Sequence, residues 1–247
     1  MMTVLGILQA RMTSRRLPGK VLKPILGVPM LARQIERIRR ARELEKLVVA
    51  TSTDSTDDPV AELCTRIGIT CFRGSLNDVL ERYHHAALQF DPRYIVRLTG
   101  DCPLTDPEVI DAAIHMCRDG AFDYVTNAIE GGYPDGLDVE VFTLASLQQA
   151  YREARQPAQR EHVTPFIDSQ PNRFKIGHLK SEIDHSGLRW TVDEPQDFRL
   201  VTLIYEALYP SRPNFATRDI LALLGAHPEW KTINAGIERN AGYKRSL

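Results

Sequence analysis

The sequence has few cysteines, few aromatic residues and no long apolar run, and each shortage argues against a class of protein. Its four cysteines form no CxxC pair and no metal-finger spacing, so we expect free buried thiols rather than disulfides or a zinc site. Only 7% of the residues are aromatic, whereas proteins that bind nucleic acid commonly stack bases on aromatic side chains. No apolar stretch approaches the roughly 20 residues of a membrane span, and the N-terminus lacks the order of a signal peptide. We therefore expect a cytoplasmic protein with no nucleic-acid and no membrane partner.

The charge of the chain is distributed unevenly. The 247 residues carry a net charge of only −1, yet residues 1–50 hold eleven Lys and Arg against three Asp and Glu. The rest of the chain must therefore sum to −9. Because the positive charge is local rather than spread along a face, it suits a compact polyanion such as a nucleoside triphosphate better than a nucleic acid.

Strand-like and helix-like segments alternate through most of the length. This pattern is typical of an α/β layered domain with a largely parallel sheet, and 43% hydrophobic content is enough for a substantial core. We expect the arginines of the first helix to lie mostly on its solvated flank. The predicted strands are 3–8, 47–51, 70–72, 94–98, 123–126, 137–142, 174–178 and 188–192. The predicted helices are 29–41, 56–66, 77–89, 106–117, 144–155, 160–168, 195–208 and 217–224.

We see no internal repeat and no low-complexity linker, so the chain is predicted to form a single domain over residues 1–247. Residues from about 131 to 180 interrupt the regular alternation and begin with a turn-rich stretch, Gly131-Gly132-Tyr133-Pro134-Asp135-Gly136. We interpret this segment as an elaboration that serves as a substrate lid, as a dimer arm, or as both.

The loop after the first predicted strand carries four cations, and it reads Gln-Ala-Arg-Met-Thr-Ser-Arg-Arg-Leu-Pro-Gly-Lys over residues 9–20. Serine, glycine and proline let the backbone turn sharply, and arginine forks and a lysine match phosphate oxygens. Ligands of α/β proteins gather at the carboxyl ends of the strands, which favours a phosphate-binding loop over a merely solvated basic one. The GxxxxGK[ST] spacing of a Walker A loop is not met.

Two aspartates follow predicted strands at the same edge. Asp101 lies in Thr99-Gly100-Asp101-Cys102-Pro103, and Asp193 precedes the helix that Pro195 begins. One or two carboxylates can hold Mg²⁺ while water and phosphate oxygens complete its coordination. The alternatives are that Asp101 merely forms a turn and that Asp193 caps a helix, although capping and metal binding are compatible.

The chain resembles the CMP-sugar synthetase (cytidylyltransferase) superfamily. The resemblance is carried by the string ARxxSxRLPGK at residues 10–20, by the Gly100-Asp101 turn and by the Asp193-x-Pro195-x-Asp197 segment. That string is similar to the nucleotide-binding signature of 3-deoxy-manno-octulosonate cytidylyltransferases. Over roughly residues 3 to 210 the chain is more similar still to the spore coat polysaccharide biosynthesis protein F family, which has stretches like DGLDVE at 135–140 and EHVTP at 161–165.

This resemblance implies a three-layer α/β/α Rossmann-like nucleotidyltransferase fold with a mostly parallel sheet. It also implies an enzyme in which an acceptor oxygen attacks the α-phosphorus of CTP and pyrophosphate is released, with Mg²⁺ as cofactor. The implied catalytic residues are Arg11, Lys20 and Asp101, and the implied Mg²⁺ ligands are Asp101 and Asp193. The implied nucleotide-binding residues are Ala10, Arg11, Ser14, Arg16, Gly19, Lys20 and Thr99. Arg15, outside the fixed letters of the signature, is expected at the surface.

The acceptor does not follow from the resemblance. Thr99 stands where the octulosonate enzymes have glutamine, and their sugar-site pattern is altered at Ser75–Arg82. A small acidic or phosphorylated acceptor needs directed polar groups, and the elaboration offers Asp138, Glu140, Arg160, Glu161 and His162. The alternative is that these residues form a polar interface of a homodimer or the start of a helix.

The leading hypothesis is therefore a Mg²⁺-dependent cytidylyltransferase that activates a sugar acid or related acceptor for surface polysaccharide or glycoconjugate synthesis. A sugar-nucleotide-dependent glycosyltransferase is a second possibility, but it would be expected to show a DxD motif where this chain has Thr99-Gly100-Asp101. A catalytically silent nucleotide-binding assembly protein is a third, which the intact Lys20, Asp101 and Asp193 argue against.

Overall fold

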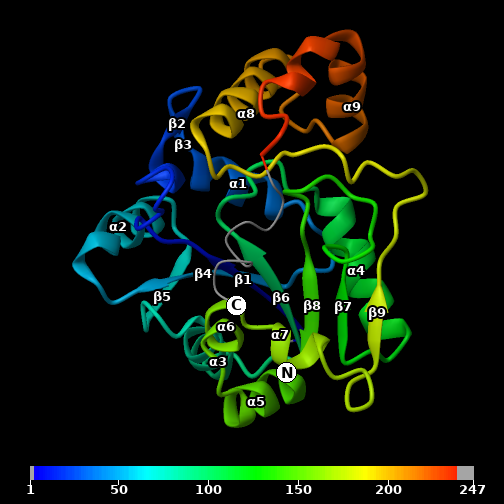
Figure 1. The fold of residues 1–247 in the computed structure, drawn as a ribbon. Helices are drawn as coiled ribbons and strands as arrows, with labels where there is room; N and C mark the ends of the chain where they lie inside the picture. The colour runs from blue at the N-terminus through cyan, green and yellow to red at the C-terminus, as the bar shows by residue number, and fades with distance from the viewer. Residues whose placement is uncertain (1–2, 238–247) are drawn as a thin grey trace.

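The structure, a computed structural model, describes residues 3–237, and a seven-stranded sheet lies at their centre (Figure 1). The strand order is β5-β4-β1-β6-β8-β7-β9, and all strands run parallel except β8, which is antiparallel to both of its neighbours. The strands are β1 (Val4–Gln9), β4 (Lys46–Ser52), β5 (Thr70–Gly74), β6 (Tyr94–Thr99), β7 (Tyr124–Thr126), β8 (Glu140–Thr143) and β9 (Ile176–His178). The short strands β2 (Pro24–Ile25) and β3 (Val28–Pro29) form a separate hairpin, which the sequence interpretation missed.

Helices cover both faces of the sheet. They are α1 (Met30–Ile38), α2 (Asp58–Arg66), α3 (Val79–Leu88), α4 (Pro107–Asp119), α5 (Leu144–Glu153), α6 (Pro157–His162), α7 (Pro165–Asp168), α8 (Pro195–Leu208) and α9 (Thr217–Ala226). Single turns of 3₁₀ helix, η1 (Lys20–Leu22), η2 (Ser55–Asp57) and η3 (Pro228–Thr232), complete the set. Helix α4 begins with Pro107 after the cap Asp106, whose side chain accepts a hydrogen bond from the backbone N–H of Glu108.

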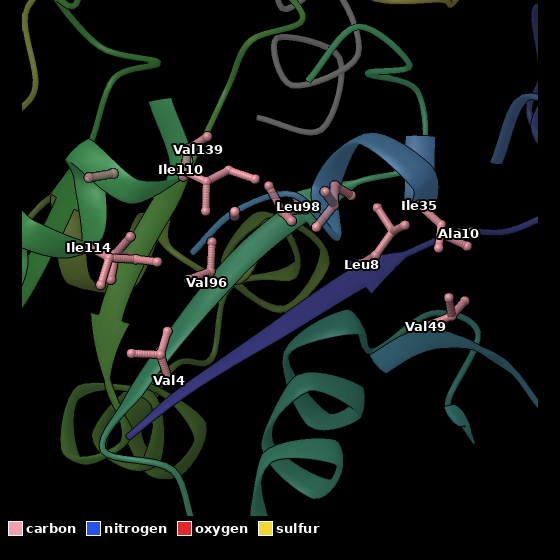
Figure 2. Packing of buried hydrophobic residues seen from close by; sticks show 14 of the residues in the cluster. Val4, Leu8, Ala10, Ile35, Val49, Val96, Leu98, Ile110, Ile114 and Val139 are labelled. Carbon is pink, nitrogen blue, oxygen red and sulfur yellow. The ribbon is translucent and has the colours of Figure 1, made fainter. Parts of the chain in front are cut away.

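Two hydrophobic clusters make the layers. Strand β1 is almost wholly buried because it lies in the middle of the sheet, where both of its faces are covered. One cluster joins the sheet to α1, α2 and α4, and the other joins it to α3, α5 and α7. Figure 2 shows part of the first cluster, with side chains of β1 and β6 beside Ile110 and Ile114 of α4. The three-layer α/β/α fold expected from the sequence is confirmed.

A third cluster joins α8 and α9 to the extended chain before them, and these helices lie together at the top of Figure 1. It buries Trp190 and Val192 from the extended chain and, from the N-terminal part, Leu17 and Ile25. The basic loop is therefore anchored by an apolar side chain, Leu17, in the same cluster that holds the chain leading into α8.

Three expectations about elements are wrong. Residues 188–192 form no ladder strand, and only an isolated bridge joins Arg189 to Asp135. Residues 160–168 are split between α6 and α7 because Val163 has a positive φ of 73°. The arginines of α1 do not all face solvent: Arg33 and Arg37 are 7% and 1% exposed and donate to backbone carbonyls, including that of Phe215.

Most of the segment expected as an elaboration lies inside the layers. Strand β8 is inserted between β6 and β7, and β9 forms the edge of the sheet beyond β7. Helices α5 and α7 pack on one face of the sheet. The cysteines are free, with Cys64, Cys102 and Cys117 buried and Cys71 half-buried. Within residues 3–237 no helix combines the length and the apolar character that a membrane crossing requires.

Candidate active site

A buried carboxylate anchors the backbone of the basic loop. Asp57, fully buried in η2, accepts hydrogen bonds from the backbone N–H of Met12 at 2.7 Å and of Ser52 at 3.1 Å. The loop also closes on itself, since the N–H of Gly19 donates to the carbonyl of Met12 at 3.0 Å. The path of the loop from the end of β1 is thus fixed by a hydrogen-bonded frame, and its side chains are left to project from it.

Gly19 turns the chain into η1. Its φ of 68° and ψ of 14° place it in the left-handed region, which glycine adopts without the cost that a Cβ brings. The hydroxyl of Ser14 accepts from the N–H of Leu17 at 3.4 Å, which tightens the preceding turn. Lys20 follows directly as the first residue of η1, and its side chain runs back toward the sheet edge.

The ammonium of Lys20 lies between two carboxylates. Its Nζ is 2.8 Å from Oδ1 of Asp193 and 3.3 Å from Oδ2 of Asp101, and it donates to the carbonyl of Val192 at 2.7 Å. Burial alone would lower the pKa of Lys20, but the charges of Asp101 and Asp193 outweigh it and raise the pKa above its ordinary value. Lys20 is therefore a permanent cation at this point.

Asp101 leaves the sheet directly beside the basic loop. Strands β1 and β6 pair with Gln9 opposite Thr99, and the N–H of Gly100 donates to the carbonyl of Gln9 at 2.8 Å. A Cβ on Gly100 would lie 3.0 Å from that carbonyl oxygen, so the absence of a side chain allows this close approach. Burial would raise the pKa of Asp101, but Lys20 and local hydrogen bonds hold it at about 2. Asp101 is thus an ionised carboxylate aimed at Lys20.

Asp193 reaches the same point from a different kind of element than the sequence predicts. It follows an extended segment that is docked on the Asp101 turn, where the N–H of Val192 donates to the carbonyl of Asp101 at 2.7 Å. The hydroxyl of Thr191 donates to the same carbonyl at 3.2 Å. Backbone contacts with the turn, rather than strand pairing in the sheet, therefore bring the two aspartates together.

The three cations of the signature have different partners. Arg16 pairs with Asp193 at 2.8 Å and with Glu194 at 3.2 Å, and a quarter of its side chain is exposed. Arg11 has only a loose pairing with Glu161 at 3.9 Å and is 42% exposed. Arg16 and Lys20 are thus committed to carboxylates that an incoming polyanion must displace, whereas Arg11 faces solvent at the rim of the site.

Thr99 is tied to its own strand end. Its hydroxyl lies 3.3 Å from Sγ of Cys102, and its carbonyl accepts from the side chain of Gln34 at 2.8 Å. Ala10, buried at the start of the loop, donates its N–H to the carbonyl of Ala50 on β4. Both residues lie at the carboxyl edge of the sheet, next to Asp101.

The acceptor candidates are spread over β8 and α6. Glu140 is buried opposite Arg97 in the β6–β8 register, pairs with it, and accepts from Tyr124 at 2.6 Å and from Thr164 at 2.5 Å. Arg160 pairs with Asp78 and donates to the carbonyl of Tyr151. These contacts tie Glu140 to the neighbouring strands and to the start of α7, and they tie Arg160 to α3 and α5.

Two other candidates remain near the loop. Burial lowers the pKa of His162 below its ordinary value, while the neighbouring Glu161, the partner of Arg11, opposes the shift. Asp138, in the half-buried turn before β8, contributes to the negative field that helps to raise the pKa of the Cys102 thiol, after the larger effect of burial. The roles of all five acceptor candidates stay predictions.

Sequence reasoning missed a buried arginine beside the site. Arg189 contacts the carboxylates of Asp135, Asp193 and Asp197. Arg189, Asp193 and Asp197 follow one another at intervals of four residues, but this spacing predicts contact only within a helix, and Arg189 and Asp193 lie before α8 in extended chain.

The donor set fits a divalent cation. Asp101 and Asp193 each direct one oxygen at the point that the Lys20 ammonium now holds, and carboxylate oxygens are the ligands that Mg²⁺ prefers. Within residues 3–237 no group of three or more His, Cys, Asp or Glu residues is arranged to hold a metal ion, so phosphate and water would have to complete the coordination. Among the described residues the formal charges at this site sum to −2, since Arg16, Lys20 and Arg189 face Asp101, Asp135, Asp193, Glu194 and Asp197.

The chain matches the model of one protein family, described as cytidylyltransferase, over residues 5–216. It is 32% identical over 238 residues to the spore coat polysaccharide biosynthesis protein SpsF of Bacillus subtilis, an alignment that covers 93% of this chain and 97% of the relative. Its fold is similar to that of a cytidylyltransferase from Leptospira borgpetersenii serovar Hardjo-bovis, with a TM-score of 0.90 and 32% identity over 97% of this chain and 100% of the other.

A more distant solved structure shares the fold. It is a CMP:2-keto-3-deoxy-manno-octonic acid synthetase complexed with CTP, with a TM-score of 0.65 and 19% identity over 83% of this chain and 99% of the other. The family match covers most of the chain and includes the basic loop, the Asp101 turn and the Asp193 segment. The chain belongs to the cytidylyltransferase family.

Proposed function

We propose that the protein transfers CMP from CTP to a sugar acid or related acceptor, with Mg²⁺ as cofactor and pyrophosphate as the second product. The observation that carries this proposal is the convergence of Asp101 and Asp193 on the Lys20 ammonium beneath a basic loop. The family supports the transfer of a cytidylyl group, and a relative named for spore coat polysaccharide biosynthesis supports a role in surface polysaccharide or glycoconjugate synthesis. The neighbour solved with CTP shares the fold.

In the proposed reaction an oxygen of the acceptor forms a bond to the α-phosphorus of CTP as the bond to the bridging oxygen of the pyrophosphate breaks. Lys20, Arg16 and Arg11 would bind the triphosphate and offset the negative charge that grows on the leaving group. Asp101 and Asp193 would hold Mg²⁺, which supplies positive charge to the phosphate oxygens when bound. The chain contributes position and charge, and no covalent intermediate is needed.

Lys20 and Arg16 have a second role in this scheme. Both pair with Asp193, and Lys20 also pairs with Asp101. A triphosphate would attract both cations and free the two aspartates for the metal. The acceptor would enter from the side of Asp138 and His162. We also propose that the protein acts in the cytoplasm and that it forms a homodimer.

The test is pyrophosphate release by the purified protein with Mg²⁺, each of the four nucleoside triphosphates in turn, and a panel of sugar acids and phosphorylated or phosphonate acceptors. CTP is expected to give the highest rate, and mass spectrometry should find a CMP conjugate of the acceptor. D101N is expected to lose Mg²⁺-dependent turnover while keeping its circular dichroism spectrum, and D111N, on α4 with its carboxylate bound to backbone N–H groups away from the site, is the control.

Absence of pyrophosphate with every acceptor, together with no nucleotide-dependent rise in melting temperature, would refute the enzymatic proposal. Unchanged turnover in D101N would refute the role given to Asp101. A product in which a sugar has moved from a nucleotide to another molecule would identify a glycosyltransferase instead.

A further inference from the structure

Arg189 lies in the extended chain before α8 with 8% of its side chain exposed. Its guanidinium group contacts the carboxylates of three different aspartates. Its NH1 is 2.6 Å from Asp135, its NH2 is 3.2 Å from Oδ2 of Asp193, and its Nε is 3.0 Å from Asp197. Burying so much charge is costly, and a well-packed apolar core is often at least as stable. Stability alone therefore does not explain why Arg189 is buried among three carboxylates.

The contact with Asp193 sets the direction of that carboxylate. Oδ2 of Asp193 is held by Arg189 and Arg16, and Oδ1 is left to face Lys20 and, beyond it, Asp101. Arg16 is partly exposed and would turn to a bound triphosphate. Arg189 is buried and cannot follow, so it is the partner that keeps Asp193 oriented after the nucleotide has entered.

Arg189 is itself fixed on two sides. Asp197, on the first turn of α8, accepts from Arg189 with both oxygens and also from the N–H groups of residues 193 and 194. The side chain of Asn234 donates to the carbonyl of Arg189 at 2.9 Å and to Asp197 at 2.8 Å. These bonds tie the guanidinium to the helix that follows the metal-site segment.

Asp135 ties the same guanidinium to the turn that leads to the acceptor candidate Asp138. Its N–H donates to the carbonyl of Leu188, and its own carbonyl accepts from the N–H of Trp190 at 2.6 Å. Arg189 thus connects three separate parts of the chain: the turn before β8, the Asp193 segment and the start of α8.

We propose that Arg189 is a positioning residue for the metal site, which holds Asp193 in the orientation that lets Asp193 and Asp101 bind one divalent cation, and which transmits the position of the Asp135 turn to that carboxylate. The inference rests on the proposed function, because it takes Asp193 to be a Mg²⁺ ligand. It concerns how the chain prepares the site and adds a residue that the nucleotide-binding signature does not contain.

The test compares R189K and R189M with R33K. Arg33 has the same 8% side-chain exposure, but it donates to the backbone carbonyls of residues 25 and 26 and pairs with Glu36 rather than contacting the site. Binding of Mn²⁺ is followed by electron paramagnetic resonance in the presence of a CTP analogue that cannot be hydrolysed. Affinity for the analogue without metal and the melting temperature are measured in parallel.

Loss of an outer-shell partner weakens metal binding by about 10- to 100-fold, so we expect a fall of this size in R189M. R189K should fall less, because lysine keeps the charge but cannot reach three carboxylates with one rigid fork. R33K should bind Mn²⁺ as the wild type does, even where its melting temperature falls as far as that of R189K. If R189K or R189M does not fold, D135N, which keeps the arginine, should still weaken Mn²⁺ binding.

The inference would be overturned if folded R189M bound Mn²⁺ with the affinity of the wild type, or if R33K lost as much Mn²⁺ affinity as the Arg189 variants. If the Arg189 variants do not fold, wild-type Mn²⁺ affinity in D135N would overturn it. A wild-type protein that binds Mn²⁺ with the analogue but releases no pyrophosphate from CTP would refute the proposed reaction and leave the inference standing. A wild type that binds no Mn²⁺ in the presence of the CTP analogue would overturn the inference together with the metal role of Asp101 and Asp193.

Discussion

Lys20 has two possible kinds of partner at the site, and in the structure its one ammonium pairs with two aspartates. The same group belongs to the signature loop that we expect to bind phosphate. The ammonium donates to Asp101, to Asp193 and to the carbonyl of Val192. Under the proposed function, lysine and metal would therefore compete for the same two carboxylates.

Replacement of Lys20 by methionine tests this competition. K20M is expected to bind Mn²⁺ more tightly than the wild type without nucleotide, because no ammonium has to be displaced from Asp101 and Asp193. It is also expected to bind CTP more weakly, because a phosphate partner is lost. Titration followed by electron paramagnetic resonance gives the first value and calorimetry the second. K23M, three residues along, is the control, and Mn²⁺ affinity unchanged in K20M would contradict the argument.

His162 makes the stability of the fold depend on pH. Its pKa in the folded protein lies below the ordinary value of about 6.5, chiefly because burial disfavours the charged imidazolium. Below about pH 6.5 the unfolded chain takes up a proton that the folded chain resists, so acidification lowers the free energy of unfolding. In H162Q this contribution is absent.

Urea denaturation of both proteins at several pH values between 7 and 5 measures the effect. The free energy of unfolding of the wild type, minus that of H162Q, is expected to fall as the pH falls. A difference that stays constant or grows on acidification would show that His162 is not held in its neutral form by the fold.

At the scale of elements, the segments with strong patterns were the ones that the sequence could place. Strand β1 and helix α8 have continuous apolar character or clear caps, and their predicted bounds agree with the structure within a residue. Residues 188–192 alternate apolar and polar side chains as a strand does, but they pair with a turn and a loop, which no local pattern reveals. The break at Val163 depends on one residue with a positive φ, a conformation that β-branched side chains rarely adopt.

The same limit applies to the site. The sequence motifs identified Lys20, Asp101 and Asp193. These residues meet because the loop after β1 and the turn after β6 lie side by side and the Asp193 segment docks on that turn. Asp57 and Arg189 act through long-range contacts with the loop and with Asp193, so their partners are visible only in the folded chain.

Gly136 tests how the turn before β8 supports the Asp193 segment. Its φ is 109°, and a Cβ there would lie 2.3 Å from the backbone nitrogen of Thr191. G136A is therefore expected to lose about 3 kcal/mol or more of the free energy of unfolding and to weaken metal binding. Gly187, in the turn before the Asp193 segment, has no atom within 4 Å of the position that a Cβ would take, so G187A should change stability by less than about 0.5 kcal/mol. Urea denaturation separates the two, and equal effects would contradict the close approach.

At the scale of the whole molecule, the cations near the N-terminus include two arginines that are buried and three residues that lie on the signature loop. Arg33 and Arg37 are buried in the fold and donate to carbonyls of the β2–β3 hairpin and of the chain after β6. Arg11, Arg16 and Lys20 lie on the loop at the carboxyl edge of the sheet. The cations available to a ligand are thus concentrated at one place, beside a pair of carboxylates.

This arrangement predicts that CTP and Mg²⁺ stabilise the whole protein more together than the sum of their separate effects. A ligand at 100 times its dissociation constant raises the free energy of unfolding by about 2.7 kcal/mol, provided that it binds the folded state alone. CTP by itself must pull Lys20 and Arg16 away, which leaves Asp101 without Lys20 and Asp193 with Arg189 alone, and Mg²⁺ by itself must displace Lys20. Each ligand removes the obstacle to the other, so their binding energies couple. Urea denaturation with CTP, with Mg²⁺, with both and with neither gives the coupling directly. It should vanish in D101N, and additive effects in the wild type would mean that the loop cations and the aspartates do not serve one site.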